Sequence, residues 1–329
     1  MQEQGVKLSR RRLLGAALAA PALPALAQGD WPNRPIRIIV AQPAGGNLDI
    51  LVRGVAEGLR QELGQSVIVE NRAGGQGVIG LEACANAAPD GTTFCAVNIE
   101  NMSTAPHVLP ELYARYASLR PVTEIATGQA VLVGSLEVPA GATLREFVAW
   151  ARGRPGLNYG SSGVGSAQQL VWEWIKAREG LQMEHVPFRG ISDAFRELVG
   201  GRLHASYGGL ALAMPLIREG RIRALAVLGG ERVPDLPGTP SMVELGYDYP
   251  YAGPWWGFAA PGGVPDAIVE RLAAATRRIV RDEDFHRRML APHFFSGVGS
   301  TPQEFAAQIA RQREASVELL RLSGLLPAR

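Results

Sequence analysis

The stretch that decides the fold is residues 36–59, IRIIVAQPAGGNLDILVRGVAEGL. Its first part, Ile36 to Val40, is a β-branched apolar run that predicts a short buried strand. A glycine-rich turn over residues 42–47 follows it. Beyond the turn, apolar residues recur at helical spacing: Leu48, Leu51, Val52, Val55 and Leu59. Strand, glycine turn and helix in this order are typical of the first unit of an α/β sheet.

The same pattern recurs along the chain and predicts two sheets. Further strands are expected near residues 67–70, 94–97, 131–134, 157–160, 184–186, 203–207, 223–228 and 255–259. Residues 232–265 are rich in proline and glycine, which suits a crossing between lobes. We therefore expect an α/β protein with two lobes, each a mostly parallel sheet flanked by helices. Residues 28–129 plus 254–329 should form lobe 1, and residues 130–253 lobe 2.

Length and composition exclude several classes of protein. A chain of 329 residues with 47% hydrophobic and 19% charged residues is neither disordered nor a disulfide scaffold. The formal charge of +2 comes from residues 1–27, which hold four basic residues and one acidic residue. The remainder is close to neutral, so no basic excess drives binding to nucleic acid or to anionic lipid.

The first residues are typical of an export signal. A polar start leads to Ser9-Arg10-Arg11-Arg12-Leu13-Leu14, which resembles a twin-arginine signal; a Sec signal with a chance arginine cluster is the alternative. Ala25 and Ala27 form an A-x-A site, so cleavage is expected near Ala27. The apolar stretch is shorter than the ~20 residues that span a bilayer. We expect residues 28–329 to be a soluble periplasmic protein.

Cys84 and Cys95 would then lie in an oxidising compartment. One falls on a predicted helix and the other on the next strand, so a disulfide is geometrically feasible. Two buried thiols are the alternative, and the sequence does not decide between them.

Two similar turns, one in each half, are the main functional candidates. Residues 42–47 and 161–166 each follow a strand and open a helix. Small residues let backbone N–H groups approach a ligand, and a helix start favours negative charge. In open α/β sheets ligands bind at the carboxyl ends of strands, where these turns should lie. Facing each other, they would hold a small molecule with one or two carboxylates; alternatively, both are tight turns with helix caps only.

Three side chains near these turns have two interpretations each. Asp49 either caps its helix or approaches the ligand through a water or an amine. Trp255 and Trp256 either wall the ligand or belong to the core, and alternation along a strand turns only one of them toward the site.

The main competing pattern is Gly75-Gln76-Gly77-Val78-Ile79-Gly80, with Glu100 twenty residues further on, which fits a dinucleotide fingerprint. The predicted strand ends at Glu70, however, too early for a pyrophosphate turn. No G-x-S-x-G, phosphate loop or H-E-x-x-H is present, and the five histidines lack ligand spacing. We expect no enzyme, cofactor or metal; the alternative is a twin-arginine-exported NAD(P)-dependent oxidoreductase.

A series of motifs in fixed order resembles the Bug family, the TctC-type extracytoplasmic solute receptors of tripartite tricarboxylate transporters. The motifs are WPNRPIR (31–37), PAGGNLD (43–49), VENRAG (69–74), APDGTT (88–93), LNYGS (157–161), HVPFRG (185–190), GRIRALAV (220–227) and GSTPQEF (299–305). The resemblance covers essentially the whole chain after residue 27.

The resemblance implies a two-lobed, type II periplasmic-binding-protein fold. It also implies a monomeric receptor that closes on a mono- or dicarboxylate in an interlobe cleft and delivers it to membrane permease subunits. It implies that residues 43–49 and 161–169 grip carboxylates through backbone N–H groups and waters. Gln168-Gln169 replaces a frequent His, and Tyr207-Gly208-Gly209 replaces a common Asp-Asn pair, which favours plain carboxylates over amine-bearing ligands. The predicted ligand-binding residues are Pro43, Ala44, Gly45, Gly46, Asn47, Asp49, Ser161, Ser162, Gly163, Val164, Gly165, Ser166, Gln169, Tyr207 and Trp255.

Overall fold

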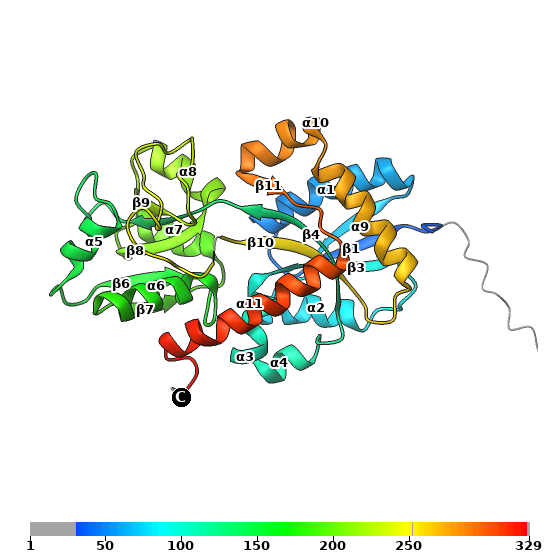
Figure 1. The fold of residues 1–329 in the computed structure, drawn as a ribbon, viewed down its shortest axis with the longest axis horizontal. Helices are drawn as coiled ribbons and strands as arrows, with labels where there is room; N and C mark the ends of the chain where they lie inside the picture. Colours follow the sequence, from blue (N-terminus) through cyan, green and yellow to red (C-terminus); the bar gives the residue numbers. More distant parts are fainter. Residues whose placement is uncertain (1–30, 252, 328–329) are drawn as a thin grey trace, which may run out of the picture.

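The computed structural model describes residues 31–251 and 253–327, so the predicted signal peptide lies outside the described residues. Two sheets with helices packed around each form two lobes side by side (Figure 1). The expected two-lobed α/β architecture is confirmed. In the described part of the chain, no helix combines the length and the apolar character needed to cross a membrane.

Lobe 1 contains a six-stranded sheet in the order β11-β4-β10-β3-β1-β2. Its strands are β1 (Ile36–Val40), β2 (Val67–Asn71), β3 (Thr93–Asn98), β4 (Arg120–Gly128), β10 (Trp255–Ala260) and β11 (Phe295–Gly297). Lobe 2 contains a five-stranded sheet in the order β7-β6-β8-β5-β9. Its strands are β5 (Ala130–Gly134), β6 (Asn158–Ser161), β7 (Glu184–Pro187), β8 (Ala205–Gly209) and β9 (Arg223–Val227).

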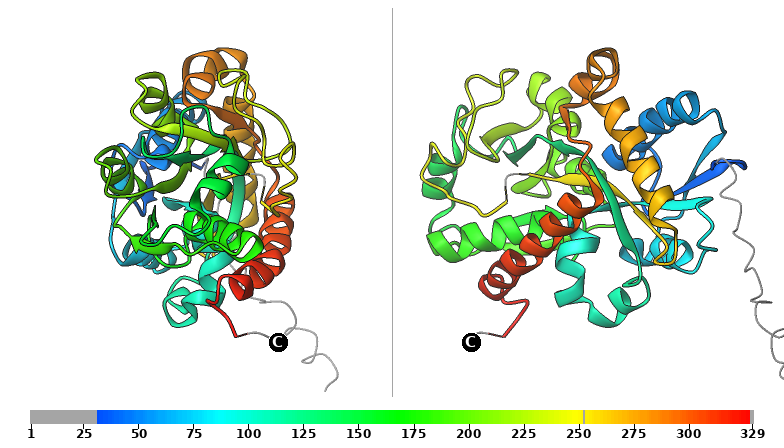
Figure 2. Two further views of the ribbon diagram at one scale, coloured as in Figure 1. Left: turned by 90° about the vertical axis from the view of Figure 1, so that its left-hand side faces the viewer. Right: turned by 45° about the vertical axis from the view of Figure 1, so that its right-hand side comes forward.

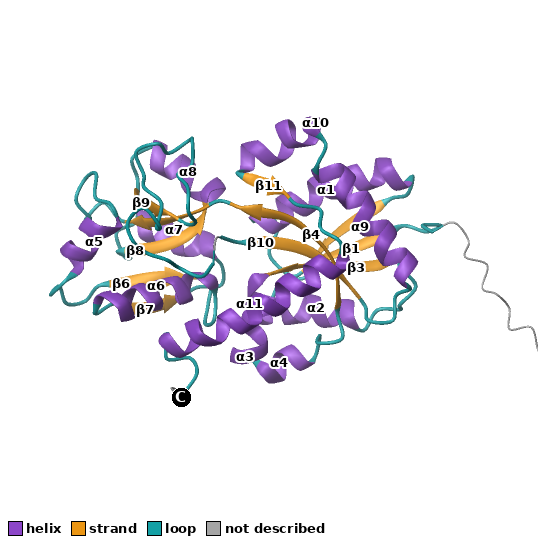
Figure 3. Cartoon of the chain, viewed as in Figure 1, coloured by secondary structure: helices purple, strands orange, loops and turns teal. Residues whose placement is uncertain are grey.

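Both sheets are mixed: most strands of each sheet run in one direction, and β10 and β11 in lobe 1 and β5 in lobe 2 run in the opposite direction. β1 pairs in parallel with β2 and β3, whereas β10 is antiparallel to both of its neighbours, β3 and β4. In lobe 2, β6 is parallel to β7 and β8, whereas β5 is antiparallel to β8 and β9. The reversed strands β5 and β10 are the strands that the chain enters when it crosses from the other lobe (Figure 3). A strand arriving from the other lobe enters without a βαβ crossover, which alone would keep it parallel.

Helices form most of the connections between successive strands. Those of lobe 1 are α1 (Asn47–Leu63), α2 (Val78–Ala85), α3 (Ala105–Val108), α4 (Pro110–Ala114), α9 (Asp266–Val280), α10 (Glu283–Phe285) and α11 (Pro302–Leu322). Those of lobe 2 are α5 (Leu144–Ala151), α6 (Ala167–Glu179), α7 (Ile191–Val199) and α8 (Leu210–Arg218). Short 3-10 turns lie at η2 (Gly75–Gly77) and η5 (Ala291–His293), and π-helical turns at η3 (Glu100–Thr104) and η4 (His286–Leu290). Capping boxes open α5 and α11 at Thr143 and Thr301.

The long helix α11 ties the two lobes together. It packs on β4 in lobe 1 and against α6 in lobe 2, and the two helices lie side by side in both views (Figures 1 and 2). Leu170 of α6 is fully buried in the same apolar cluster as Phe305 and Leu319 of α11. The helix α11 of lobe 1 therefore shares an apolar contact with lobe 2 near the start of α6.

Cys84 and Cys95 are free, buried thiols. Burial, followed by the neighbouring Cys84 thiol, raises the pKa of Cys95. The sequence left a disulfide and two buried thiols as alternatives, and the structure contains the two buried thiols.

Candidate ligand-binding site between the lobes

The two predicted turns share one construction. In the first, Gly45 has φ 82° and its N–H donates to Asp49 Oδ2 at 2.9 Å. In the second, Gly165 has φ 77° and its N–H donates to Gln169 Oε1 at 2.8 Å. In each turn, the acceptor residue lies four positions after the glycine, in the first turn of the following helix. Each turn is thus locked to its helix, and the positive φ explains the glycine at both positions.

Asp49 is a structural anchor of the first turn. Its side chain is nearly buried, and besides the Gly45 N–H it accepts hydrogen bonds from Arg53 Nε at 3.0 Å and Asn71 Nδ2 at 2.8 Å. Burial alone would raise the pKa of Asp49, but these hydrogen bonds outweigh it and lower the pKa below its ordinary value. The carboxylate is therefore ionised and fully used by the protein. Of the two interpretations, the capping role is the one that these contacts support.

The start of α1 is left without a cap. Its N-cap residue, Gly46, has no side chain to accept a hydrogen bond. The N–H groups of Asn47 and Leu48 make no hydrogen bond to any other residue among those described. Unpaired first-turn N–H groups, together with the helix macrodipole, favour an anion at this position.

The hydroxyl groups of the second turn hold the turn itself. Ser161 Oγ lies 2.5 Å from His185 Nε2, and Ser166 Oγ donates to the Gly163 carbonyl at 2.7 Å. Ser162 Oγ donates to Gln168 Oε1 at 2.8 Å. Burial lowers the pKa of His185, which keeps its imidazole neutral at pH 7. The serine hydroxyl groups are thus engaged internally, and so are the N–H groups of Gly163, Gly165 and Ser166.

Both turns contact the opposite lobe. Thr104 of lobe 1 donates its hydroxyl to the Gly165 carbonyl at 3.2 Å. On the other turn, the Asn47 side chain packs against Gly209 at the end of β8, where an added Cβ would clash with Asn47 Nδ2. The two turns therefore lie at one interface between the lobes, and β8 reaches it with Tyr207 and Gly209.

Glu100 is a member of this interface that the site prediction missed. It follows β3 in lobe 1, and the N–H of Ala167, the first residue of α6 in lobe 2, lies at its carboxylate. Although part of the residue stays exposed, burial of the carboxylate raises the pKa of Glu100, against the opposing effects of its own backbone N–H and then of the Ala167 N–H. Burial and then the Glu100 charge raise the pKa of Tyr207, which is 3% exposed. No local sequence pattern predicts this contact, because its two residues belong to different lobes.

Trp255 lies in the core of lobe 1 and not with the turns. It is 1% exposed, its ring packs on Phe305, and its indole N–H donates to Gln312 Oε1 of α11. Trp256 occupies the other face of the sheet, against Phe295. The helix α11 covers the face that Trp255 presents, so we leave this residue out of the site.

The glycines of the dinucleotide-like pattern serve packing. Gly75 to Gly77 form a 3-10 turn, and a Cβ on Gly80 would lie 2.8 Å from the Arg72 carbonyl oxygen and 2.9 Å from Ala41 Cβ. Gly80 thus lets α2 approach β1. Glu100, the expected ribose ligand of the pattern, lies at the start of α6 instead.

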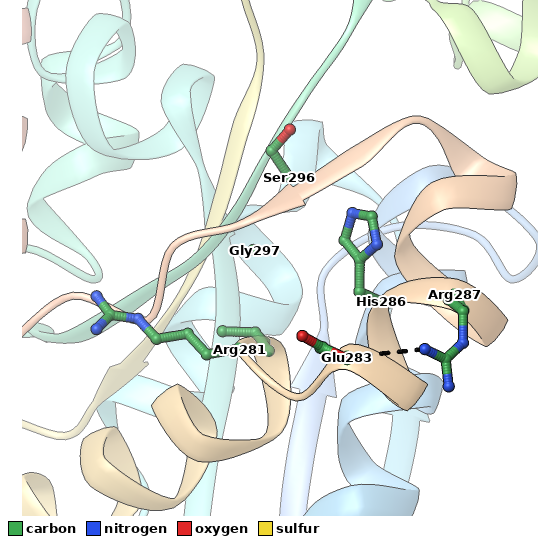
Figure 4. Close-up of a pocket in the computed structure, with 7 residues that line it drawn as sticks. Arg281, Glu283, His286, Arg287, Ser296 and Gly297 are labelled. Atoms are coloured by element: carbon green, nitrogen blue, oxygen red, sulfur yellow. Dashed lines mark ion pairs between the residues drawn. The ribbon is translucent and has the colours of Figure 1, made fainter.

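A hollow of about 520 Å³ lies elsewhere in lobe 1, beside α9, η4 and β11 (Figure 4). It is lined by Val280, Arg281, Glu283, His286, Arg287, Ser296 and Gly297. Arg287 pairs there with Glu283 at 3.9 Å and with Asp284. None of the predicted site residues contributes to it. Among the described residues, no group of His, Cys, Asp and Glu is arranged to hold a metal ion.

Comparison with known proteins assigns a family. Residues 51–325 match the model of the tripartite tricarboxylate transporter family receptor, TctC. The chain belongs to this family. It is 35% identical over 268 residues to a UPF0065 protein of Bordetella pertussis, with 81% of this chain and 82% of the relative covered. It is 33% identical over 270 residues to BugT of the same organism, with 79% and 81% covered. The resemblance to Bug receptors is confirmed.

Solved structures of similar proteins share the architecture. An R. palustris protein solved with adipate has a TM-score of 0.83 and 28% identity, with 90% of this chain and 99% of that chain covered. The periplasmic binding protein BugD has a TM-score of 0.80 and 26% identity over the same shares. MatC from Rhodopseudomonas palustris, solved with malate, has a TM-score of 0.79 and 26% identity, with 88% and 99% covered. This family member is therefore a two-lobed solute-binding receptor.

Proposed function

We propose that the protein captures a small organic acid between its lobes, with a carboxylate of the solute on the uncapped start of α1. The observation that carries this proposal is the pair of unpaired N–H groups at Asn47 and Leu48, at the interface to which the second turn also belongs. Charge-assisted hydrogen bonds from backbone N–H groups suit a carboxylate. The adipate and malate bound by two similar proteins support the same ligand class.

In this proposal the solute enters when the lobes separate. Thr104 and Asn47 of lobe 1 touch Gly165 and Gly209 of lobe 2, so the two lobes are in contact beside both turns. We place the hinge at the two crossings of the chain, residues 128–130 and 253–255. There the Gly128 N–H donates to the Pro254 carbonyl at 2.8 Å, and Gly253 has φ 147°, which other residues rarely adopt. In this proposal lobe 1 comprises residues 28–129 and 254–329, and lobe 2 residues 130–253.

The role that fits this site is transport by binding, without catalysis. The similar BugD is a periplasmic binding protein, which supports export of this chain. The twin-arginine signal and its cleavage near Ala27 stay predictions from the sequence. The receptor would then act as a monomer that presents its solute to the permease subunits of a tripartite transporter. The glycines of residues 75–80 support helix packing, which leaves the oxidoreductase alternative without a cofactor site.

Thermal-shift screening tests the proposal. A ligand at one hundred times its dissociation constant adds about 2.7 kcal/mol of stability. We expect at least one organic acid from a panel of mono-, di- and amino-carboxylates to raise the melting temperature, and NAD(P) to leave it unchanged. A shift with NAD(P) and none with any organic acid would reverse the assignment.

A further inference from the structure

Phe294 holds a backbone conformation that is unusual for its residue type. It ends the 3-10 turn η5 with φ 56° and ψ 38°, and it is the one non-glycine residue with a positive φ among residues 31–251 and 253–327. Left-handed backbone is unfavourable for a bulky side chain and persists where the surrounding structure enforces it. Glycine adopts the same conformation without strain. We therefore expect the phenylalanine ring to make a contact that glycine could not provide.

The ring of Phe294 reaches the opposite lobe. Phe294 belongs to lobe 1, yet its side chain packs on the apolar cluster of lobe 2 that contains Leu210, Ala213 and Met214 of α8. Within the described part of the chain, it is the only residue of lobe 1 that packs on this cluster. The segment that leads into β11 accordingly lies next to α8 (Figures 1 and 2). The side chain thus forms an apolar contact between the lobes.

Backbone hydrogen bonds connect this contact to the proposed hinge. Gln129 donates its N–H to the Phe294 carbonyl at 3.1 Å, and its own carbonyl accepts from the N–H of Leu210 at 2.8 Å. Leu210 is the first residue of α8 and directly follows Gly209, which the Asn47 side chain contacts. Phe294 is therefore linked, through Gln129 and the start of α8, to the contact between the first turn and lobe 2.

The contact is not part of a closely packed core. A hollow of about 370 Å³ lies beside it, lined by Ala211 and Met214 from lobe 2 and by Pro292 and Phe294 from lobe 1, among others. Phe294 itself is only half-buried. Cores packed to crystal-like density resist displacement, whereas a ring with free space on one side can part from its neighbour while both cores stay intact. The lobes can thus separate at this contact.

We propose that Phe294 is an interlobe brace: it stabilises the arrangement in which the lobes are in contact beside both turns, and so it raises the affinity for the solute. This inference rests on the proposed function, which places one crossing of the hinge at residues 128–130. Rotation there moves α8 relative to η5, because α8 belongs to lobe 2 and η5 to lobe 1. The apparent affinity of a receptor falls in proportion to the population of its binding-competent arrangement. Phe294 is thus a positioning residue that acts through the lobes.

Two variants of Phe294 and one matched control test the brace. Phe294→Ala removes the ring and keeps a residue that disfavours left-handed backbone, whereas Phe294→Gly removes the ring and adopts that backbone freely. If the alanine variant does not fold, the glycine variant carries the test. The control is Phe285→Ala, because Phe285 is also a half-buried phenylalanine of lobe 1 but packs on the apolar cluster of its own lobe.

Pulsed electron spin resonance measures the distance between the lobes without a ligand. Spin labels are attached at Ser66→Cys in lobe 1 and Gln182→Cys in lobe 2, which are exposed positions, while the two natural cysteines are buried. We expect both Phe294 variants to broaden the ligand-free distance distribution relative to the natural protein. In calorimetric titration, both should bind the tightest organic acid more weakly by about fivefold or more. Phe285→Ala should match the natural protein in both measurements.

The outcomes separate the brace from the receptor role. An unchanged ligand-free distribution in folded Phe294→Gly, natural or tighter binding by that variant, or an equal change in Phe285→Ala overturns the inference and leaves the proposed function standing. Failure of every organic acid to bind the folded natural protein overturns the proposed function. The ligand-free distances still test in that case whether Phe294 holds the lobes together.

Discussion

Replacing Gly46 by valine tests the backbone anion site with little risk to the fold. Gly46 has φ −81°, which any residue adopts, and an added Cβ would lie 3.9 Å from its nearest neighbour, the Pro43 carbonyl oxygen. The larger side chain would nevertheless stand over the N–H groups of Asn47 and Leu48. A hydrogen bond to a charged group contributes about 1.5–3 kcal/mol, so losing two costs about 3–6 kcal/mol. At 1.4 kcal/mol per factor of ten, the affinity should fall by roughly two to four orders of magnitude.

Gly190→Val is the matched control. Gly190 is the N-cap of α7, has φ −170°, carries no side-chain cap and would have nothing within 4 Å of an added Cβ. Both substitutions should cost a similar, small amount of unfolding free energy, about 1 kcal/mol or less. Calorimetric titration with the tightest organic acid then compares the two folded variants. Natural affinity in Gly46→Val, or an equal loss in Gly190→Val, would refute the backbone site. Gly163 in the second turn offers no such test, because its φ of 126° would strain any valine.

Two further predictions concern carboxylates of the interface. Asp49→Asn should lower the free energy of unfolding by about 1–3 kcal/mol at neutral pH. Because the pKa of Asp49 is lowered in the folded protein, this deficit should shrink as the pH falls below about 4. A pH-independent deficit in urea unfolding would contradict the anchoring role. Glu100→Gln should raise the unfolding free energy of the ligand-free protein at neutral pH, since burial raises the pKa of Glu100 and its ionisation opposes folding. That gain should vanish below the ordinary glutamate pKa of about 4.3, and a destabilised variant at neutral pH would show that Glu100 is already well compensated.

Local patterns predict the turns and their helices, because the determinants lie within a few residues of one another. β1, the glycine turn and α1 follow from residues 36–59, and the bond from Gly45 to Asp49 spans four residues. The capping box at Thr301 is likewise predicted from residues 301–304 alone. The apolar periodicity of a strand does not show, however, whether it runs parallel or antiparallel to its neighbours, so the mixed order of both sheets could not be predicted.

The features that the sequence left undetermined depend on contacts between distant segments. Alternation along β10 predicts that Trp255 and Trp256 lie on opposite faces of the sheet. It does not predict that α11, which carries Gln312, covers the face that Trp255 occupies. Glu100 acquires its role from Ala167 on the other lobe. Spacing from Gly80 suggested a ribose ligand instead, because a one-dimensional pattern does not show which lobe a side chain meets.

A crystal structure of the receptor with its natural solute, copurified or identified by screening, tests the central claim most directly. We predict a carboxylate within hydrogen-bonding distance of the Asn47 and Leu48 N–H groups, with Gly209 of lobe 2 closing over it. A solute bound in the hollow beside Arg281, or a complex in which the start of α1 is unoccupied, would contradict the account.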